Sequence, residues 1–307
     1  KKYMTHTLAW QKGGEVKVAY RPVHSKTLTN DVQYFPPRER SDIQSVFDTM
    51  EALKQYRPDF IDITYGAGGS TQALTVEMAV RARRETGLNV MAHITCSAQT
   101  REGIHDVLMQ LEDEGIENLI VLRGDPPGNQ SSFVPTNEGF THATDLISHV
   151  KRHFQFCVAA ACYPESHPES PDICSDMKFT RQKLDAGAEF LITQLFYNND
   201  DFYSFMDRAA RFRIDVPVIP GLMPIVSTSQ IRRITTLCGA SIPPDLDRLL
   251  SEHSDDSCYV RQLGIEHATV QAQGLLDNGA MGLHFYVLNR SYSITKILDN
   301  LRASGHL

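Results

Sequence analysis

The strongest constraint on the fold is an alternation, repeated along 307 residues, of short apolar runs with longer segments of helical periodicity. The apolar runs are rich in Val, Ile and Phe, and such strands followed by helices indicate a parallel sheet that helices cover. The predicted strands are residues 32–35, 60–64, 90–95, 119–122, 156–162, 190–194, 216–220 and 283–288. The predicted helices include residues 41–56, 71–85, 101–114, 143–154, 175–186, 200–212 and 259–278.

A weak internal repeat supports this interpretation. Residues 113–121, 185–193 and 277–285 each run from a helix end through a glycine into an apolar strand, and glycine suits the left-handed residue that ends a helix. Eight strands favour a closed (β/α)8 barrel, the TIM barrel, over an open doubly wound sheet. No Gly-x-Gly-x-x-Gly follows the first strand, which also argues against a dinucleotide-binding sheet.

We therefore predict an α/β fold in which residues 1–307 form one (β/α)8 barrel domain, with residues 1–28 as an N-terminal extension. The extension should add a strand or hairpin, with a strand at 16–20 covering the bottom of the barrel and a connection at 25–30. Residues 239–258, which contain two adjacent prolines, should form an insertion between the seventh and eighth strands.

Composition excludes several classes of function. The net charge is -7 and no basic stripe is present, which argues against a nucleic-acid partner. No apolar stretch approaches the ~18 residues that span a bilayer, and the first residues lack the apolar core of a signal peptide. The six cysteines have no zinc-site spacing. We expect a cytoplasmic protein with free thiols, without a bound metal or a membrane partner.

Polar residues follow the apolar runs, where barrel enzymes place their sites. They include Gln33, Thr64 to Gly69, His93, Thr95, Arg123 to Asp125, Tyr163 to His167, Gln194, Asn289 and Arg290. Taken singly, they also fit structural roles: the glycines could make a tight turn, His93 could be a core histidine and Asp125 a cap. As a group they contain many hydrogen-bonding side chains and few carboxylates, which favours a large polar ligand over a hydrolytic pair of carboxylates.

Seven motifs occur in a fixed order. They are FPPR at 35–38, TYGAGGST at 64–71, HITC at 93–96, LRGDPP at 122–127, YPESHP at 163–168, ITQLF at 192–196 and HFYVLNR at 284–290. In this order they resemble the methylenetetrahydrofolate reductase family, from about Gln33 to the C-terminus.

The resemblance implies an FAD-dependent oxidoreductase of one-carbon metabolism and methionine biosynthesis. In that family a barrel holds FAD at its C-terminal face, and NADH or NADPH reduces the flavin and leaves. Methylenetetrahydrofolate then accepts the hydride at the same face and becomes 5-methyltetrahydrofolate, in a ping-pong sequence.

The resemblance also implies residue roles, carried over motif by motif. The flavin ring would meet Thr64, Tyr65, Ala67, His93, Leu122, Arg123, Gly124 and Asp125. The ribityl, diphosphate and adenosine parts would meet His142, Ala143, Tyr163, His167, Asp176 and Lys183. Folate would meet Gln194, Gln230 and Arg290. Asp125 would also be catalytic, since a carboxylate there favours a cationic folate intermediate.

Gln33 departs from the family pattern, which has a glutamic acid that donates a proton at this catalytic position. An amide has the same shape but no proton to give, and general acid catalysis is typically worth 10²–10⁴-fold. We therefore expect flavin binding and reduction by NAD(P)H to survive, and folate reduction to be slowed. Asp31, Glu39 or Asp125 could take over the proton. Gln33 is either native or a substitution, and it could also point away from the site.

Two alternatives stay open. The chain could be a catalytically weakened barrel that binds flavin or folate, or an unrelated barrel lyase. The second has less support, because no lysine sits securely at a strand end for a Schiff base. NADH and NADPH are not distinguished, and a homo-oligomer is possible.

Overall fold

The computed structural model describes residues 10–12, 15–17, 29–37, 39–65, 72–126 and 133–307. Its main sheet contains parallel strands in the order β10-β11-β3-β4-β5-β6-β7-β8-β9. These are β3 (Thr29–Tyr34), β4 (Phe60–Ile63), β5 (Asn89–Thr95), β6 (Asn118–Leu122), β7 (Cys157–Cys162), β8 (Phe190–Thr193), β9 (Val218–Ile219), β10 (Gly221–Leu222) and β11 (Gly282–Tyr286).

The first and last strands in this order are two halves of one strand. Only Pro220 separates β9 from β10, and β9 pairs with β8 while β10 pairs with β11. Pro220 has no N–H to donate, but its carbonyl accepts a hydrogen bond of 3.0 Å from the His284 backbone. The sheet therefore closes through residues 218–222, and the predicted (β/α)8 barrel is confirmed. We call residues 218–222 the seam.

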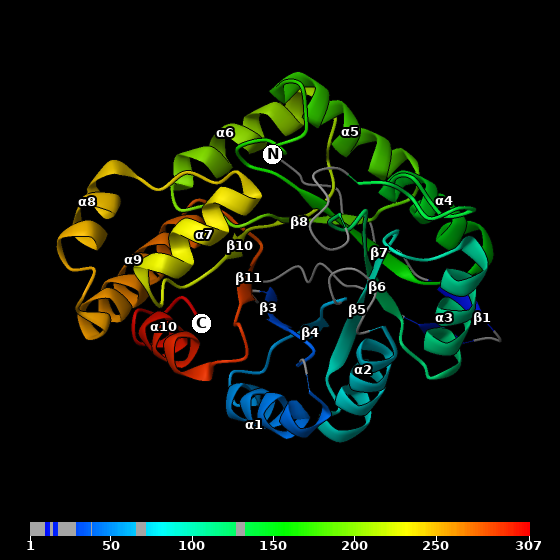
Figure 1. Cartoon of the computed structure of the whole chain (residues 1–307), viewed down its shortest axis with the longest axis horizontal. Coiled ribbons are helices and arrows are strands. Elements are labelled where there is room, and N and C mark those ends of the chain that lie inside the picture. The colour runs from blue at the N-terminus through cyan, green and yellow to red at the C-terminus, as the bar shows by residue number, and fades with distance from the viewer. Residues whose placement is uncertain (1–9, 13–14, 18–28, 38, 66–71, 127–132) are drawn as a thin grey trace.

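Helices form an outer ring around the strands (Figure 1). They are α1 (Ile43–Lys54), α2 (Gln72–Thr86), α3 (Arg101–Asp113), α4 (Ala143–His153), α5 (Ile173–Asp185), α6 (Asn199–Arg211), α7 (Thr228–Cys238), α8 (Pro244–Glu252), α9 (Ser257–Asp277) and α10 (Ser291–Ala303). Side-chain caps fix several starts: Thr100 accepts from the Gly103 N–H ahead of α3, and Ser227 from the Gln230 N–H ahead of α7. The predicted insertion at 239–258 contains α8.

The N-terminal extension contains an antiparallel hairpin of β1 (Trp10–Lys12) and β2 (Glu15–Lys17). Part of the predicted strand at 16–20 lies outside the described residues. The predicted connection at 25–30 was wrong at its end, because β3 already begins at Thr29. Thr29 and Asn30 pair with Gly282 and Leu283 of β11, so the neighbouring strand extends β3 through Asn30, a residue of low strand propensity.

Alternation along the strands creates two apolar regions. Outward residues such as Val32, Ile61 and Ile94 pack beneath the helices. Inward residues form a separate core inside the barrel, made of Phe60, Met91, Ile120, Cys157, Ala159, Phe190, Ile192 and Ile219. The same alternation puts the polar residues at 31, 33, 62, 93 and 284 on the inward side. No helix among the described residues is both long and apolar enough to cross a membrane.

Candidate functional site

A buried group of polar side chains lies where β11, β3 and β4 meet inside the barrel. Asp31 is level with His284 in the strand register, and Gln33 is level with Asp62. Asp31, Asp62 and His284 are each 0% exposed, and Gln33 is 6% exposed. We call Asp31, Gln33, Asp62 and His284 the polar core.

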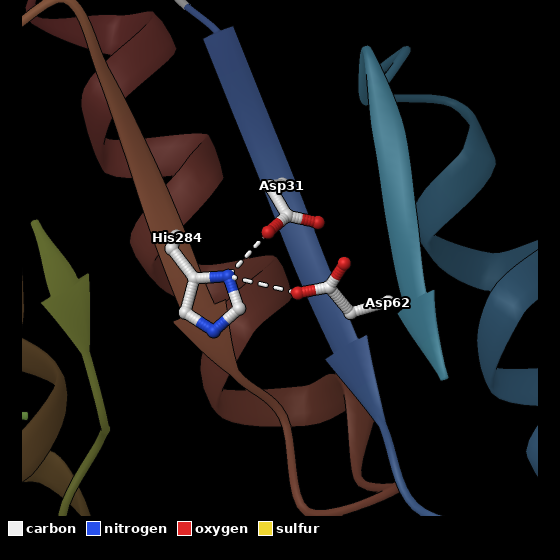
Figure 2. Close-up of side chains that lie close together, drawn as sticks. All are labelled: Asp31, Asp62 and His284. Atoms are coloured by element: carbon white, nitrogen blue, oxygen red, sulfur yellow. Dashed lines mark hydrogen bonds and ion pairs between the residues drawn. The ribbon is translucent and has the colours of Figure 1, made fainter. Parts of the chain in front are cut away.

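The imidazole of His284 links the other members of the polar core. Its Nδ1 is hydrogen-bonded to Asp31 Oδ2 and lies 3.5 Å from Asp62 Oδ2 (Figure 2). Its Nε2 is 3.1 Å from Gln33 Oε1. The contacts form a continuous chain Asp31–His284–Gln33 that runs toward the C-terminal end of β3, so the Gln33 side chain points into the barrel.

Burial shifts the titration of this group toward neutral forms. It raises the pKa of Asp31 well above its usual value, and burial together with the charge of Asp31 raises the pKa of Asp62 to about 7. Burial also lowers the pKa of His284 to about 4. Within the described part of the chain, one oxygen of Asp31 and both oxygens of Asp62 have no hydrogen-bond partner. Carboxylates in such surroundings retain protons.

Donor atoms of Asp31, Asp62 and His284 all lie within 4.8 Å of one another, close enough to share a cation or protons. Both ring nitrogens of His284 already contact protein acceptors. Burial raises the pKa of both carboxyls, which favours protons on the group. Shared protons are therefore sufficient to explain the arrangement.

Beside the polar core, the residues predicted at the ends of β4 and β5 are buried. Thr64 is 6% and Tyr65 8% exposed, and the Tyr65 hydroxyl accepts a 2.8 Å hydrogen bond from Gln99. His93 Nε2 lies 3.7 Å from Asp62 Oδ2, too far for a hydrogen bond. That nitrogen has no hydrogen-bond partner among the described residues. Ala67 lies outside the described residues.

The loop after β6 carries three predicted residues beyond Leu122. The Arg123 guanidinium makes a two-pronged ion pair with Glu169, at 2.6 and 2.7 Å. Gly124 has φ 84°, and a Cβ there would collide with the Ser97 side chain. Asp125 is exposed, and its backbone carbonyl accepts a 3.0 Å hydrogen bond from Ser97. Arg123 and Asp125 thus lie on opposite sides of a tightly packed glycine.

The residues predicted for the distal part of a cofactor lie along β7, α4 and α5. The rings of Tyr163 and His167 meet edge to face, with centroids 4.7 Å apart. Asp176 accepts a hydrogen bond from Ser170 at 2.9 Å, and Lys183 donates to the Ala161 carbonyl at 2.8 Å. Burial lowers the pKa of Lys183 while Asp176 opposes that shift.

His142 and Ala143 stand at the start of α4. The His142 N–H donates to Asp145 at 3.1 Å, so this helix start is fixed.

The three residues predicted to meet folate lie apart from the polar core. Gln194 follows β8 and accepts from the Leu195 N–H at 2.9 Å. Gln230 on α7 accepts from the Val226 N–H at 3.2 Å. Arg290 is exposed at the start of α10. Each side chain is thus set at a different strand or helix end around the barrel.

A family model described as methylenetetrahydrofolate reductase matches residues 19–302. The chain belongs to the methylenetetrahydrofolate reductase family. The match covers every strand of the barrel, so the predicted family is confirmed.

Relatives within this family come from plants, fungi and bacteria. The chain is 36% identical over 280 residues to methylenetetrahydrofolate reductase (NADH) 1 of Arabidopsis thaliana, with 88% of this chain and 47% of that protein covered. It is 31% identical over 271 residues to 5,10-methylenetetrahydrofolate reductase of Salmonella typhimurium, with 87% and 89% covered. The chain thus spans about half the length of the plant relatives and most of the length of the bacterial one.

A solved structure shares the barrel fold. It is an uncharacterized protein from Clostridium thermocellum that binds two copies of 5-methyl-5,6,7,8-tetrahydrofolic acid, with a TM-score of 0.59, 15% identity, and 91% of this chain and 95% of that chain covered. At this identity the likeness shows the fold alone.

Within this methylenetetrahydrofolate reductase barrel, sequence reasoning missed Asp62 and His284 as part of the site and named Asp31 only as a candidate proton donor. It searched the residues just after the strands, whereas these three lie inside them. The signal was present in the alternation: Asp31 and Gln33 share a face of β3, and His284 and Tyr286 share a face of β11.

Proposed function

We propose that this chain reduces 5,10-methylenetetrahydrofolate to 5-methyltetrahydrofolate, with NADH or NADPH as the electron source and FAD as the resident cofactor. The observation that carries the proposal is the family match over residues 19–302. The polar C-terminal side of the barrel supports it, because barrel enzymes place their chemistry there.

The residues present fit a flavin. His93 Nε2 is a buried polar atom without a hydrogen-bond partner among the described residues, as expected of a group that a ligand completes. Thr64, Tyr65, His93, Leu122, Arg123, Gly124 and Asp125 would hold the ring, and His142, Ala143, Tyr163, His167, Asp176 and Lys183 the ribityl-to-adenosine part. FAD, when bound, supplies a carrier that accepts a hydride from one partner and passes it to the next.

Each group in this set has a plain physical task. Gly124 lets the backbone approach a flat ring, because it carries no side chain. The Lys183 ammonium suits a phosphate as a point charge. Asp125 adds negative charge, which disfavours further negative charge nearby and favours a cationic folate. Gln194, Gln230 and Arg290 would hydrogen-bond the folate.

The folate half of the reaction consumes a proton as well as a hydride. The hydride goes to the methylene carbon, and the nitrogen that loses its bond to that carbon must gain a proton. Gln33 can hydrogen-bond that nitrogen but cannot protonate it. We therefore expect the folate half-reaction to be slower than reduction of the cofactor.

Anaerobic absorbance spectroscopy tests the proposal. The purified protein should carry FAD and be yellow, NADH or NADPH should bleach it, and methylenetetrahydrofolate should restore the colour. A colourless protein that cannot be reconstituted with FAD contradicts the proposal. Bleaching without recovery would instead indicate a barrel that binds flavin but no longer reduces folate, a reading favoured by the amide at Gln33.

A further inference from the structure

Given the proposed function, we propose that Asp31 and His284 together store the proton that folate reduction consumes, and that it leaves from His284 Nε2 beside Gln33. Asp31 precedes Gln33 by two residues on the same face of β3, so the pair would lie one step below the position where the proton is needed. Neither residue contacts solvent, since both are 0% exposed.

The two ring nitrogens of His284 each face an oxygen atom of a neighbouring side chain. Gln33 presents Oε1 to His284 Nε2 at 3.1 Å, and because an amide oxygen only accepts hydrogen bonds, this arrangement places a hydrogen on Nε2. If Nδ1 then had none, its lone pair would face a carboxylate oxygen of Asp31 at hydrogen-bond distance, and two acceptors repel. A second hydrogen must therefore lie between Nδ1 and Asp31. The pair holds one proton more than a carboxylate beside a neutral imidazole.

The surroundings keep this proton in place. Asp62 Oδ2 lies 3.5 Å from Nδ1 and favours a positive charge on the imidazole. His93 lies beyond Asp62, and the Tyr286 ring covers His284 edge to face, with centroids 4.6 Å apart. Burial raises the pKa of Asp31 and so favours the protonated pair at neutral pH. The His284 ring thus lies between the Asp62 carboxyl and the Tyr286 ring.

The nitrogen that leaves the methylene carbon replaces Gln33 Oε1 as the acceptor beside His284, while the amide turns aside. The Nε2–H bond breaks and a nitrogen–hydrogen bond forms on the substrate. The hydrogen shared with Asp31 settles on Nδ1, which leaves a neutral imidazole and an Asp31 carboxylate. A proton from water reloads the pair after the product departs.

Stopped-flow measurement of the two half-reactions in the holoenzyme tests the proposal. Asp31→Asn should slow recovery of the oxidised colour by methylenetetrahydrofolate by roughly 10²-fold, and leave bleaching by NADH or NADPH unchanged. Gln33→Glu should restore the rate in the Asp31→Asn background, because a carboxyl at 33 supplies its own proton. Asp245→Asn, an exposed site on α8, is the matched control. An Asp31→Asn enzyme as fast as the parent, or a double variant without rescue, overturns the proposal.

A second readout does not depend on turnover. In ¹⁵N-histidine NMR spectra of the holoenzyme near neutral pH, one buried histidine, absent from the spectrum of His284→Gln, should carry a hydrogen on Nε2, with a second hydrogen shared between Nδ1 and Asp31. An unprotonated Nε2 would overturn the stored proton, as would one equivalent of a divalent metal that His284→Gln removes. A parent protein that binds no flavin would instead contradict the proposed function. The spectra would still show whether the Asp31–His284 pair holds the extra proton.

Discussion

Two glycines show how much a single residue's surroundings matter at this site. Gly124 and Gly279 have nearly the same left-handed backbone, with φ of 84° and 87°. A Cβ at Gly279 would meet nothing within 4 Å, whereas one at Gly124 would collide with Ser97 and lie 3.0 Å from Thr95 Cβ. The two positions therefore separate backbone strain from crowding.

We expect Gly279→Ala to lower the free energy of unfolding by about 1 kcal/mol, the strain of a left-handed non-glycine residue. Gly124→Ala should lower it further, because the loop after β6 or the Ser97 side chain must also shift. Urea unfolding of both variants measures the difference. Equal losses would show that the loop after β6 yields freely and does not hold Arg123 and Asp125 in place.

At the scale of elements, α9 contains a glycine that allows the helix to lie close to a neighbouring segment. Gly264 lies in the middle of α9, where alanine would normally be the better helix former. Its missing Cβ leaves room for the Ile225 backbone carbonyl, with Ile225 Cβ 2.9 Å from the position a Cβ would take. The helix can therefore lie directly on the segment that follows β10.

Gly264→Ala should destabilise the protein, although the substitution favours helix formation. Gly103→Ala in α3 is the matched control, since a Cβ there would be 3.5 Å from Thr100 Oγ1, an ordinary contact. It should raise the free energy of unfolding by about 0.5–1 kcal/mol. Thermal melts of the two variants should shift in opposite directions, and a shared upward shift would refute the close contact at Ile225.

Helices α3 and α4 meet through three histidines. His105 Nδ1 lies 3.2 Å from His149 Nε2, and the His149 and His153 rings lie 4.6 Å apart. Burial first, and then the charges of His153 and His105, lower the pKa of His149 to about 4; Arg101 and Arg152 add to the effect. This helix contact therefore favours a neutral imidazole at His149.

The contact should weaken in acid. Below the unfolded pKa of about 6.5 the unfolded chain binds a proton at His149 that the folded chain refuses until about pH 4. Stability is thus complete above pH 6.5 and falls as the pH drops toward 4. His149→Gln should shrink the loss in Tm between pH 7.5 and 5, while His253→Gln should not. Some loss will remain because His284 titrates in the same direction. An unchanged loss would mean that His149 is not the sensitive group.

For the molecule as a whole, the polar core links stability to pH in the opposite sense. Asp62 has a raised pKa of about 7, so the folded chain keeps a proton that the unfolded chain releases near pH 4. The stabilisation is complete below pH 4 and is lost as the pH rises through about 7.

The stability of the Asp62→Asn variant should therefore increase relative to that of the parent protein as the pH rises. We expect the difference in free energy of unfolding to move in favour of the variant between pH 5.5 and pH 8, because an amide has no proton to lose. Guanidinium unfolding at both values measures it, with Asp245→Asn as the exposed control. A difference that does not change with pH would show that Asp62 stays ionised throughout.

Much of this molecule could be predicted from local patterns, and one part could not. The strands and the strand-end polar residues follow from periodicity, and Pro36 and Pro37 mark the end of β3. His284 meets Asp31 across 253 positions of sequence, a contact that only barrel closure creates. Charged residues inside apolar strands also look like exceptions until the register shows that they face one another.

The seam at Pro220 is a place where the barrel can open locally. β9 and β10 each pair with a neighbour over two positions, whereas β5 and β6 pair over five. Short links in a closed ring open first, and this one lies level with His284, whose backbone N–H bonds to Pro220. If the proposed proton store is correct, momentary opening there would admit water to the buried Asp31–His284 pair. The rate at which the seam opens would then limit how often the pair regains its proton.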